Sequence, residues 1–377
     1  MGAKQTRHRS VLVVGGGVGG LATAIALARR GDEVEVAELK PDWSVAGWGL
    51  LLTGPALRSL DALGLTDACA AEGYATSGEA VNCDSSGEVK ATFKVPSVLG
   101  EGRPVEIGLA RPVLLNILRG EAEARGVRLR TGLTVDTLAQ DPHGVTACLS
   151  NGEERRFDLV VGADGIRSAV RDLLGQSGKP EYTGQMVWRA LVPRPDWVTT
   201  VHTFNGSQHG AGVIPISDTR AYVFLTENTP EPMVYSQDEL ADRMVELMAD
   251  LSGRAAELRA AITDPEDVVR RRVETCLIDG DWHVGRVVLV GDAAHAPSPQ
   301  MTSGAALAIE DGVILAEELD RNATVEDALR AFSSRRLERG RHLVNISVEI
   351  AEMYIAGRLL EAFQLLRDGH AAMARRP

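Results

Sequence analysis

The segment SVLVVGGGVGGLATAIALARRGDEVEVAELK, residues 10–40, decides the fold, because it has the pattern of a strand, a glycine-rich turn, a helix and a second strand. Residues 11–14 are an uninterrupted apolar run, which is typical of a parallel strand buried on both faces. A helix is expected over 21–30, ending before Gly31, a residue type favoured just after a helix. The pattern predicts a βαβ unit of a Rossmann-like α/β fold.

The glycines of this turn follow the pattern G-x-G-x-x-G. Glycine is needed where the turn is tight, where the backbone approaches a pyrophosphate and where the helix packs on the strand. The helix N-terminus then faces the phosphates. An acid about 20 residues further on can accept hydrogen bonds from a ribose. The contacts predicted for this unit are Gly15, Gly17, Val18, Gly20, Glu38, Leu39 and Lys40.

The glycine pattern does not by itself identify the ligand. FAD and NAD(P) share the adenosine diphosphate half that such a loop binds, so both remain open on this evidence. A glycine-rich turn without any ligand is the third interpretation, although the flanking strand, helix and acid favour a dinucleotide.

Two later segments repeat the arrangement of an apolar strand that ends in glycine and an acid. FDLVVGADGIRSAVRDLL, residues 157–174, contains Asp164 and Gly165, and RVVLVGD, residues 286–292, ends in Asp292. Because ligands of open α/β sheets bind at the carboxyl ends of the strands, we expect the three strand ends to meet at one elongated cofactor. A single NAD site would not need the third motif.

These motifs, in this order, resemble those of the FAD-dependent aromatic hydroxylases of the p-hydroxybenzoate hydroxylase type, the class A flavoprotein monooxygenases. The resemblance covers almost the whole chain. It implies that Asp164 and Gly165 serve both FAD and the reduced nicotinamide, and that Asp292 binds the ribityl chain. Arg111, which opens the segment RPVLLNILRGEAEARG, is similar to a family arginine near the flavin phosphates.

The segment VGDAAHAPSPQMTSGAALAIEDG, residues 290–312, is expected to form a proline-restricted loop followed by a helix that begins at Gly304. The resemblance implies that the N-terminus of this helix faces the pyrimidine side of the flavin ring, where it would stabilise the anionic reduced form. The segment departs from the usual Gly-Gln-Gly of the family and is closer to the hydroxypyridine hydroxylases. The cofactor contacts expected here are Pro299, Ser303, Gly304 and Ala305.

The region between the second and third motifs has a different sequence pattern, since short strand patterns such as TTVHTF, AGVIPI and AYVFL alternate with turns. It predicts a mixed or antiparallel sheet inserted into the cofactor-binding fold. The predicted FAD-binding domain is discontinuous and comprises residues 1–76, 104–183 and 276–330. The predicted substrate domain comprises residues 77–103 and 184–275, and C-terminal helices are expected over 331–377.

Two side chains of the inserted region are candidates for catalysis. His209, in SQHGAGVIP, resembles a family histidine that serves as a base, and an imidazole suits removal of a phenolic or lactim proton at neutral pH. A histidine in a surface turn is the alternative. Arg189 either anchors an anionic substrate or contacts the flavin, or it forms a salt bridge between the domains. Phe204, Tyr222, Phe224 and Met301 are candidates for pocket walls or ordinary core.

Bulk properties restrict the function classes further. The formal charge of −12 disfavours nucleic acid and anionic membranes as partners. The four cysteines show no metal-ligand spacing and no disulfide framework, which is typical of a cytoplasmic protein, and no metal site is expected. No segment reaches the length of a membrane span. A monomer or a homodimer is expected.

Together these observations predict an FAD-dependent monooxygenase. The resemblance implies that NADH or NADPH reduces the flavin, that O2 forms the C4a-hydroperoxyflavin, and that a small activated aromatic or N-heteroaromatic compound is hydroxylated. The alternatives are a flavoprotein epoxidase or dehydrogenase, and a flavin-binding redox sensor without turnover.

Overall fold

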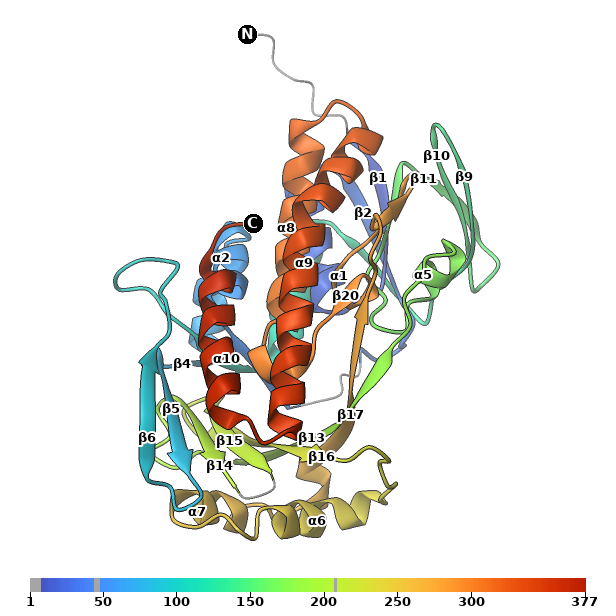
Figure 1. Cartoon of the computed structure of the whole chain (residues 1–377). Coiled ribbons are helices and arrows are strands. Elements are labelled where there is room, and N and C mark those ends of the chain that lie inside the picture. The colour runs from blue at the N-terminus through green and yellow to red at the C-terminus, as the bar shows by residue number, and fades with distance from the viewer. Residues whose placement is uncertain (1–7, 44–47, 207–208) are drawn as a thin grey trace.

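The computed structural model describes residues 8–43, 48–206 and 209–377, and it contains two large sheets joined by long strands (Figure 1). The first sheet has six strands, all parallel except β18 at its edge. Its order is β18 (His283–Val284), β19 (Val287–Leu289), β12 (Leu159–Gly162), β1 (Ser10–Val14), β2 (Glu33–Glu38) and β8 (Arg128–Thr131). The three glycine-terminated strands predicted from the sequence are therefore neighbours, as expected.

Helix α1 (Val18–Arg29) is buried along most of its length, because it packs between the first sheet and other helices. Its partners include α4 (Arg111–Ala124) and α8 (Gly304–Arg321). A Cβ atom on Gly312 would lie 2.7 Å from the backbone of Thr23, so α1 and α8 cross at very short range. This contact fixes α8, and with it the start of α8, relative to the glycine loop.

Smaller elements complete the fold. They are α2 (Gly54–Ala62), α3 (Thr66–Glu72), α5 (Ala169–Leu173), the sheet of β3 (Gly49–Leu52), β7 (Ile107–Ala110) and β4 (Tyr74–Ala75), and the sheet of β11 (Glu154–Phe157), β10 (Gly144–Leu149) and β9 (Val135–Asp141).

The second sheet has eight strands and is mixed, because β14 and β5 run parallel while the other pairs are antiparallel. Its order is β20 (His295–Ala296), β17 (Val268–Leu277), β13 (Glu181–Pro193), β16 (Arg220–Asn228), β15 (Gly210–Pro215), β14 (Val201–Asn205), β5 (Glu79–Asp84) and β6 (Val89–Lys94). The expected α/β fold with an inserted mixed sheet is confirmed.

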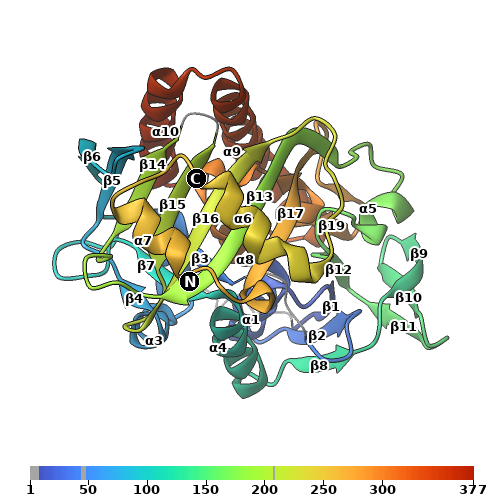
Figure 2. The ribbon, with the colours of Figure 1, turned by 90° about the horizontal axis from the view of Figure 1, so that it is seen from below.

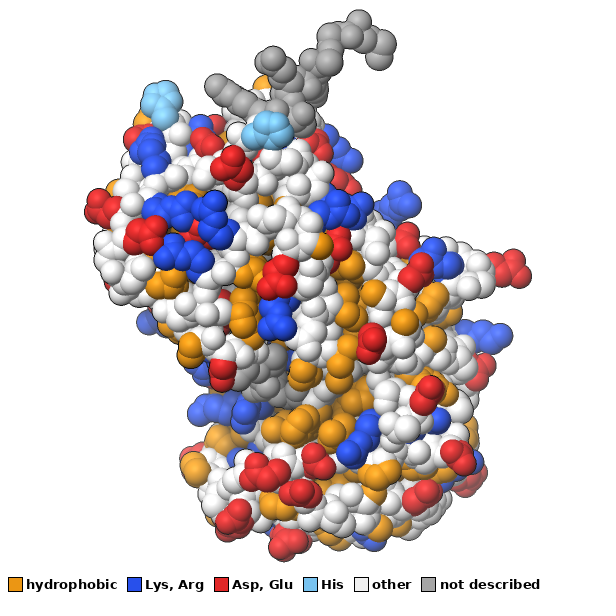
Figure 3. Space-filling view, turned by 180° about the vertical axis from the view of Figure 1, so that it is seen from behind, with side chains coloured by type: hydrophobic (Ala, Val, Ile, Leu, Met, Phe, Trp, Pro, Cys, Tyr) orange, Lys and Arg blue, Asp and Glu red, His pale blue; other side chains and the backbone are white. Residues whose placement is uncertain are grey.

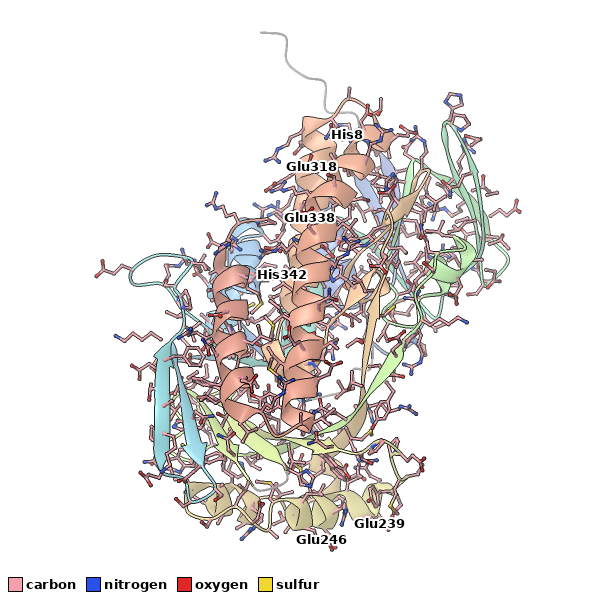
Figure 4. The ribbon with its side chains drawn as sticks, in the orientation of Figure 1. His8, Glu239, Glu246, Glu318, Glu338 and His342 are labelled. Atoms are coloured by element: carbon pink, nitrogen blue, oxygen red, sulfur yellow. The ribbon has the colours of Figure 1, made fainter. Side chains whose placement is uncertain are left out.

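One face of the second sheet is covered by α6 (Leu240–Leu247) and α7 (Arg254–Ala260), as the view from below shows (Figure 2). The side chains between these helices and the sheet form a separate core that includes Trp188, which is fully buried. The two helices are separate because Gly253, which lies between them, takes a φ of 57°. Glu239 and Glu246 lie in this outer layer (Figure 4).

The C-terminal helices α9 (Val325–Ile355) and α10 (Leu359–Ala374) pack against each other (Figure 1). Glu338 and His342 lie on α9, and Glu318 lies on the neighbouring α8 (Figure 4). Among the helices described, none is both long enough and apolar enough to cross a membrane.

A buried ion-pair network joins α8 to α9. Arg336 donates to Asp311 and to Glu310, each at 2.6 Å, and His295 lies 2.7 Å from Asp311. Burial alone would raise the pKa of Asp311, but His295 and Arg336 outweigh it and lower the pKa to about 2. Asp311 also accepts a hydrogen bond from the backbone N–H of Gly291 at 2.7 Å, so the network holds the loop that carries Asp292.

Replacing Arg336 with alanine should destabilise the fold by about 3–5 kcal/mol, because two buried carboxylates would lose their counter-charge. Arg330→Ala is the matched control on the same helix, since its side chain is 71% exposed and pairs only at the surface with Asp327. The control should cost no more than about 1 kcal/mol. Urea unfolding at pH 7 gives both values, and equal losses would show that the network contributes little.

Candidate functional site

The glycine loop after β1 leaves no room for side chains at two of its positions. A Cβ atom on Gly15, whose φ is 105°, would lie 2.4 Å from the carbonyl oxygen of Ala163. A Cβ atom on Gly20 would lie 1.9 Å from the carbonyl oxygen of Gly15. Only glycine permits this closeness, so the first and third glycines of the motif bring the loop, the helix and the neighbouring strand together.

The second glycine of the motif has the opposite surroundings. Gly17 caps α1 and is exposed, and a Cβ atom added to it would meet no other atom within 4 Å, so the space in front of the helix N-terminus is open. The next residue, Val18, is buried. The free N–H groups of the first turn therefore face a cradle that suits a pyrophosphate.

Glu38 lies at the end of β2, beside this loop. Its two carboxyl oxygens accept hydrogen bonds from the backbone N–H groups of Gly16 at 2.6 Å and Lys40 at 2.9 Å. Leu39 and Lys40 are exposed. The ring of Trp43 lies against Gly16, since a Cβ atom there would be 2.3 Å from the indole. Trp43 could not be predicted as part of the site, because a lone tryptophan after a strand carries no recognisable signal.

The three predicted motifs meet in space. A Cβ atom on Gly19 would lie 3.1 Å from the Cβ of Ala308, and one on Gly291 would lie 3.0 Å from the same atom. Asp164, by contrast, uses its side chain locally, because it accepts hydrogen bonds from the Ser168 hydroxyl and the backbone N–H of Val170. Gly165 has a φ of 81° and open space around it, so the turn after β12 presents backbone rather than a free carboxylate.

Asp292 has a carboxyl group without a partner in the groove between the first sheet and α8. Its side chain accepts no hydrogen bond from the described residues, it is exposed, and its Oδ1 would lie 3.9 Å from a Cβ atom on Gly304. Desolvation in the groove raises the pKa of Asp292, and the nearby Arg111 guanidinium opposes the shift. Arg111, at the first position of α4, is also exposed. Asp292 and Arg111 thus flank the same groove without forming an ion pair.

The start of α8 lies beside Asp292. Thr302 precedes it in the left-handed region, with a φ of 51° that is unusual for a β-branched residue. The hydroxyl of Ser303 is buried and has no hydrogen-bond partner in the described part of the chain. Ala305 is half-buried in the first turn. An unpartnered hydroxyl at a helix N-terminus that faces a groove fits a polar ligand at this position.

A cavity of about 350 Å³ lies between the second sheet and the C-terminal helices. Pro299 and Thr302 line it from the side of α8, and Arg189 and His209 line it from the sheet. Phe204, Tyr222 and Phe224 form part of its wall, whereas Met301 is buried against α9 and α10 and is core. From behind, hydrophobic side chains gather at the waist between the two parts of the molecule (Figure 3).

Arg189 lines the cavity and makes no ion pair or hydrogen bond with the residues that the structure describes. The expected alternative of an interdomain salt bridge is therefore wrong. Burial lowers the pKa of Arg189, and the neighbouring Arg111 adds to this. An unpaired guanidinium next to a second arginine makes this wall of the cavity electropositive, which suits an anionic or electron-rich ligand.

His209 also lines the cavity, directly before β15. Its Nδ1 atom is buried and has no partner in the described part of the chain. Burial lowers the pKa of His209, so the imidazole is neutral at pH 7 and free to accept a proton. As the turn alternative expects, His209 lies where the chain turns from β14 into β15, since its carbonyl oxygen accepts a hydrogen bond from the backbone N–H of Gly206 at 3.1 Å; the residue is half-buried there and lines the cavity.

His295, three residues after Asp292, does not line the cavity. It is fully buried, stacks against Trp282 with ring centroids 4.6 Å apart, and pairs with Asp311. The sequence analysis could not identify that carboxylate partner. It also missed the side chains that α10 and the segment before β7 contribute to the cavity, Leu359, Phe363, His370 and Glu106. No motif marks them.

Comparison with known proteins identifies this arrangement. The family model described as "FAD binding domain" matches residues 8–347. YetM of Bacillus subtilis is 32% identical over 96% of this chain and 100% of its own length. The 3-hydroxybenzoate 6-hydroxylase of Polaromonas naphthalenivorans is 29% identical over 92% of this chain and 88% of its own length.

Solved structures agree with these relatives. HpxO of Klebsiella pneumoniae, crystallised with FAD and uric acid, has a TM-score of 0.83 and 25% identity, and the match covers 95% of this chain and 92% of that one. The 2-methyl-3-hydroxypyridine-5-carboxylic acid oxygenase has a TM-score of 0.81 and 25% identity over 98% of this chain and 96% of that one. The chain therefore belongs to the FAD-binding family of aromatic hydroxylases and is an FAD-dependent monooxygenase.

Proposed function

We propose that this monooxygenase uses NADH or NADPH and O2 to hydroxylate a small activated aromatic or N-heteroaromatic compound. The observation that carries the proposal is the cavity. Its lining joins the start of α8, next to the groove of Asp292, to the unpaired side chains Arg189 and His209. Bound FAD would supply the redox chemistry and the activation of oxygen.

The residues that we propose for FAD extend along the groove between the first sheet and α8. The open N-terminus of α1 at Gly17 would receive the pyrophosphate, and Glu38 the adenosine ribose. Arg111 and Asp292 would bind the phosphates and the ribityl chain from opposite sides. The first turn of α8, with its unpartnered Ser303 hydroxyl, would face the flavin ring and favour its reduced anion.

The residues that we propose for the substrate lie on the sheet side of the cavity. Arg189 would orient an anionic or partly negative group, since it lines the cavity and forms no ion pair with a described residue. His209 would remove a hydroxyl or lactim proton and so enrich the ring in electrons. Relatives named for 3-hydroxybenzoate and urate support this substrate class, because both compounds are small and carry acidic protons.

A turnover assay tests the proposal directly. Purified protein with FAD and NADH or NADPH should consume nucleotide and oxygen together when a phenol or hydroxypyridine substrate is added. The product should be heavier by one oxygen atom. Nucleotide oxidation that no aromatic compound stimulates would favour a dehydrogenase or a redox sensor instead.

Asp292→Ala should weaken FAD binding by at least about tenfold, because hydrogen bonds to a charged group contribute strongly. Asp279→Ala is the control, since that carboxylate is 82% exposed and pairs at the surface with Arg341. Flavin absorbance after gel filtration measures retention in both variants. Equal flavin content in the Asp292 variant and the wild-type protein would contradict the assigned role.

His209→Ala should lower the hydroxylation rate by at least about 100-fold at pH 7 and leave FAD binding intact. The wild-type base is already neutral at this pH, because its pKa is lowered. Activity of the variant should recover as the pH rises and the substrate ionises without help. A pH–rate profile of the variant that matches the wild-type profile would show that His209 is not the base.

A further inference from the structure

Glu106 is a carboxyl group enclosed in the substrate cavity. It directly precedes β7, lines the cavity and is only 2% exposed. Its Oε2 accepts one weak hydrogen bond, at 3.3 Å, from the hydroxyl of Thr76, and no described residue forms an ion pair with it. Its other carboxyl oxygen, Oε1, has no hydrogen-bond partner in the described part of the chain. A buried carboxylate without a cation is costly, so a ligand that donates a proton would relieve it.

The surroundings of Glu106 determine when it ionises. Burial raises the pKa of Glu106 to about 7, and the Thr76 hydrogen bond works in the opposite direction. Burial and the Thr76 hydrogen bond are the causes of the shift in the pKa of Glu106. The other titratable side chains of the cavity do not contribute to it; they are Arg189, His209, Tyr222, Tyr354 and His370. The carboxyl group can therefore be protonated or ionised near neutral pH, depending on what occupies the cavity.

Glu106 and His209 are at opposite ends of the cavity. His209 directly precedes Gly210, the first residue of β15, whereas Gly108 packs on Pro215, the last residue. A Cβ atom on Gly108 would lie 1.8 Å from the Pro215 carbonyl oxygen. Five residue steps along a strand span about 17 Å, so the two side chains enter the cavity from near opposite ends of β15.

The floor between these ends is formed by the inward face of the second sheet. Phe224 covers Gly212, and Tyr222 lies beside Ile214, so the middle of the floor is apolar. Asn82 donates to the hydroxyl of Thr203 at 2.9 Å, which uses the amide within the wall. The strongest free acceptor at the Glu106 end is therefore the carboxyl group itself.

We infer that Glu106 is a substrate-binding residue, which selects neutral N-heteroaromatic compounds that present a ring N–H or O–H at the end of the cavity opposite His209. The inference rests on the proposed function and specifies its substrate class. The ionised Oε1 accepts the ring N–H or O–H as a charge-assisted hydrogen bond. When the proton transfers, the electron pair stays on the ring atom, Glu106 becomes the neutral acid, and the proton later leaves to water or product.

The test uses the FAD-loaded protein and 4(1H)-quinolone as a neutral probe with a ring N–H. Its dissociation constant is measured from the change in flavin absorbance between pH 5.5 and 8.5, without nucleotide, so that no turnover is needed. N-methyl-4-quinolone, which lacks the N–H, is the matched ligand. Glu106→Gln removes the charge, and Thr76→Val removes the neighbouring hydroxyl but keeps the carboxyl group.

In the wild-type protein the quinolone should bind more tightly as the pH rises through about 7, because the carboxylate is the better acceptor. Glu106→Gln should weaken binding by at least about tenfold at pH 8 and abolish this pH dependence. Thr76→Val should keep a pH dependence but shift it to higher pH, because it removes the hydrogen bond that lowers the pKa of Glu106. The N-methyl compound should bind the wild-type protein and the Glu106 variant equally at every pH.

Unchanged affinity and pH dependence in Glu106→Gln would overturn the inference, and so would failure of the wild-type protein to bind the quinolone. Glu106-dependent binding without any hydroxylation would support the inference while contradicting the proposed function. Hydroxylation of phenols together with Glu106-independent quinolone binding would support the proposed function and contradict the inference. Flavin absorbance confirms that each variant retains FAD.

Discussion

The fold depends on a steric constraint at the ends of three parallel strands. The loop after β1 touches the loop after β12 so closely that a Cβ atom on Gly15 would overlap the Ala163 carbonyl group. The same loop packs on the start of α1, where Gly20 is required. Gly19 and Gly291 both approach Ala308 of α8. These contacts align two helix N-termini, those of α1 and α8, along one groove.

A buried ion-pair network then holds the loop at the end of the groove next to the cavity. Asp311 pairs with Arg336 and His295 inside the protein and also holds the Gly291 N–H. The buried charges there are fully compensated, which keeps the loop before α8 in one position. Asp292, Arg189 and Glu106 differ in that each is left without a charged partner among the described residues. The paired charges of this network hold the fold together, whereas these three unpaired groups lie where a cofactor or substrate would bind.

The sequence predicted the parts of the site that are made by local chain geometry. Strand, glycine loop and helix follow each other within a few residues, so Gly15, Gly17, Gly20 and Glu38 could be placed from spacing alone. The loop that carries Asp292 could be predicted for the same reason. The partner of His295 could not be predicted, because His295 is in β20 whereas Asp311 lies on α8, and only tertiary packing brings them together. Glu106 was missed likewise, since its burial depends on β7 packing against β15.

The most direct measurement of the central claim is a titration of the flavin-free protein with FAD, followed by flavin fluorescence. One FAD should bind per chain, and Gly20→Val should abolish binding, because its side chain would force α1 away from the loop. Absence of binding by the wild-type protein, or undiminished binding by the valine variant, would contradict the account of a single groove closed by these glycines.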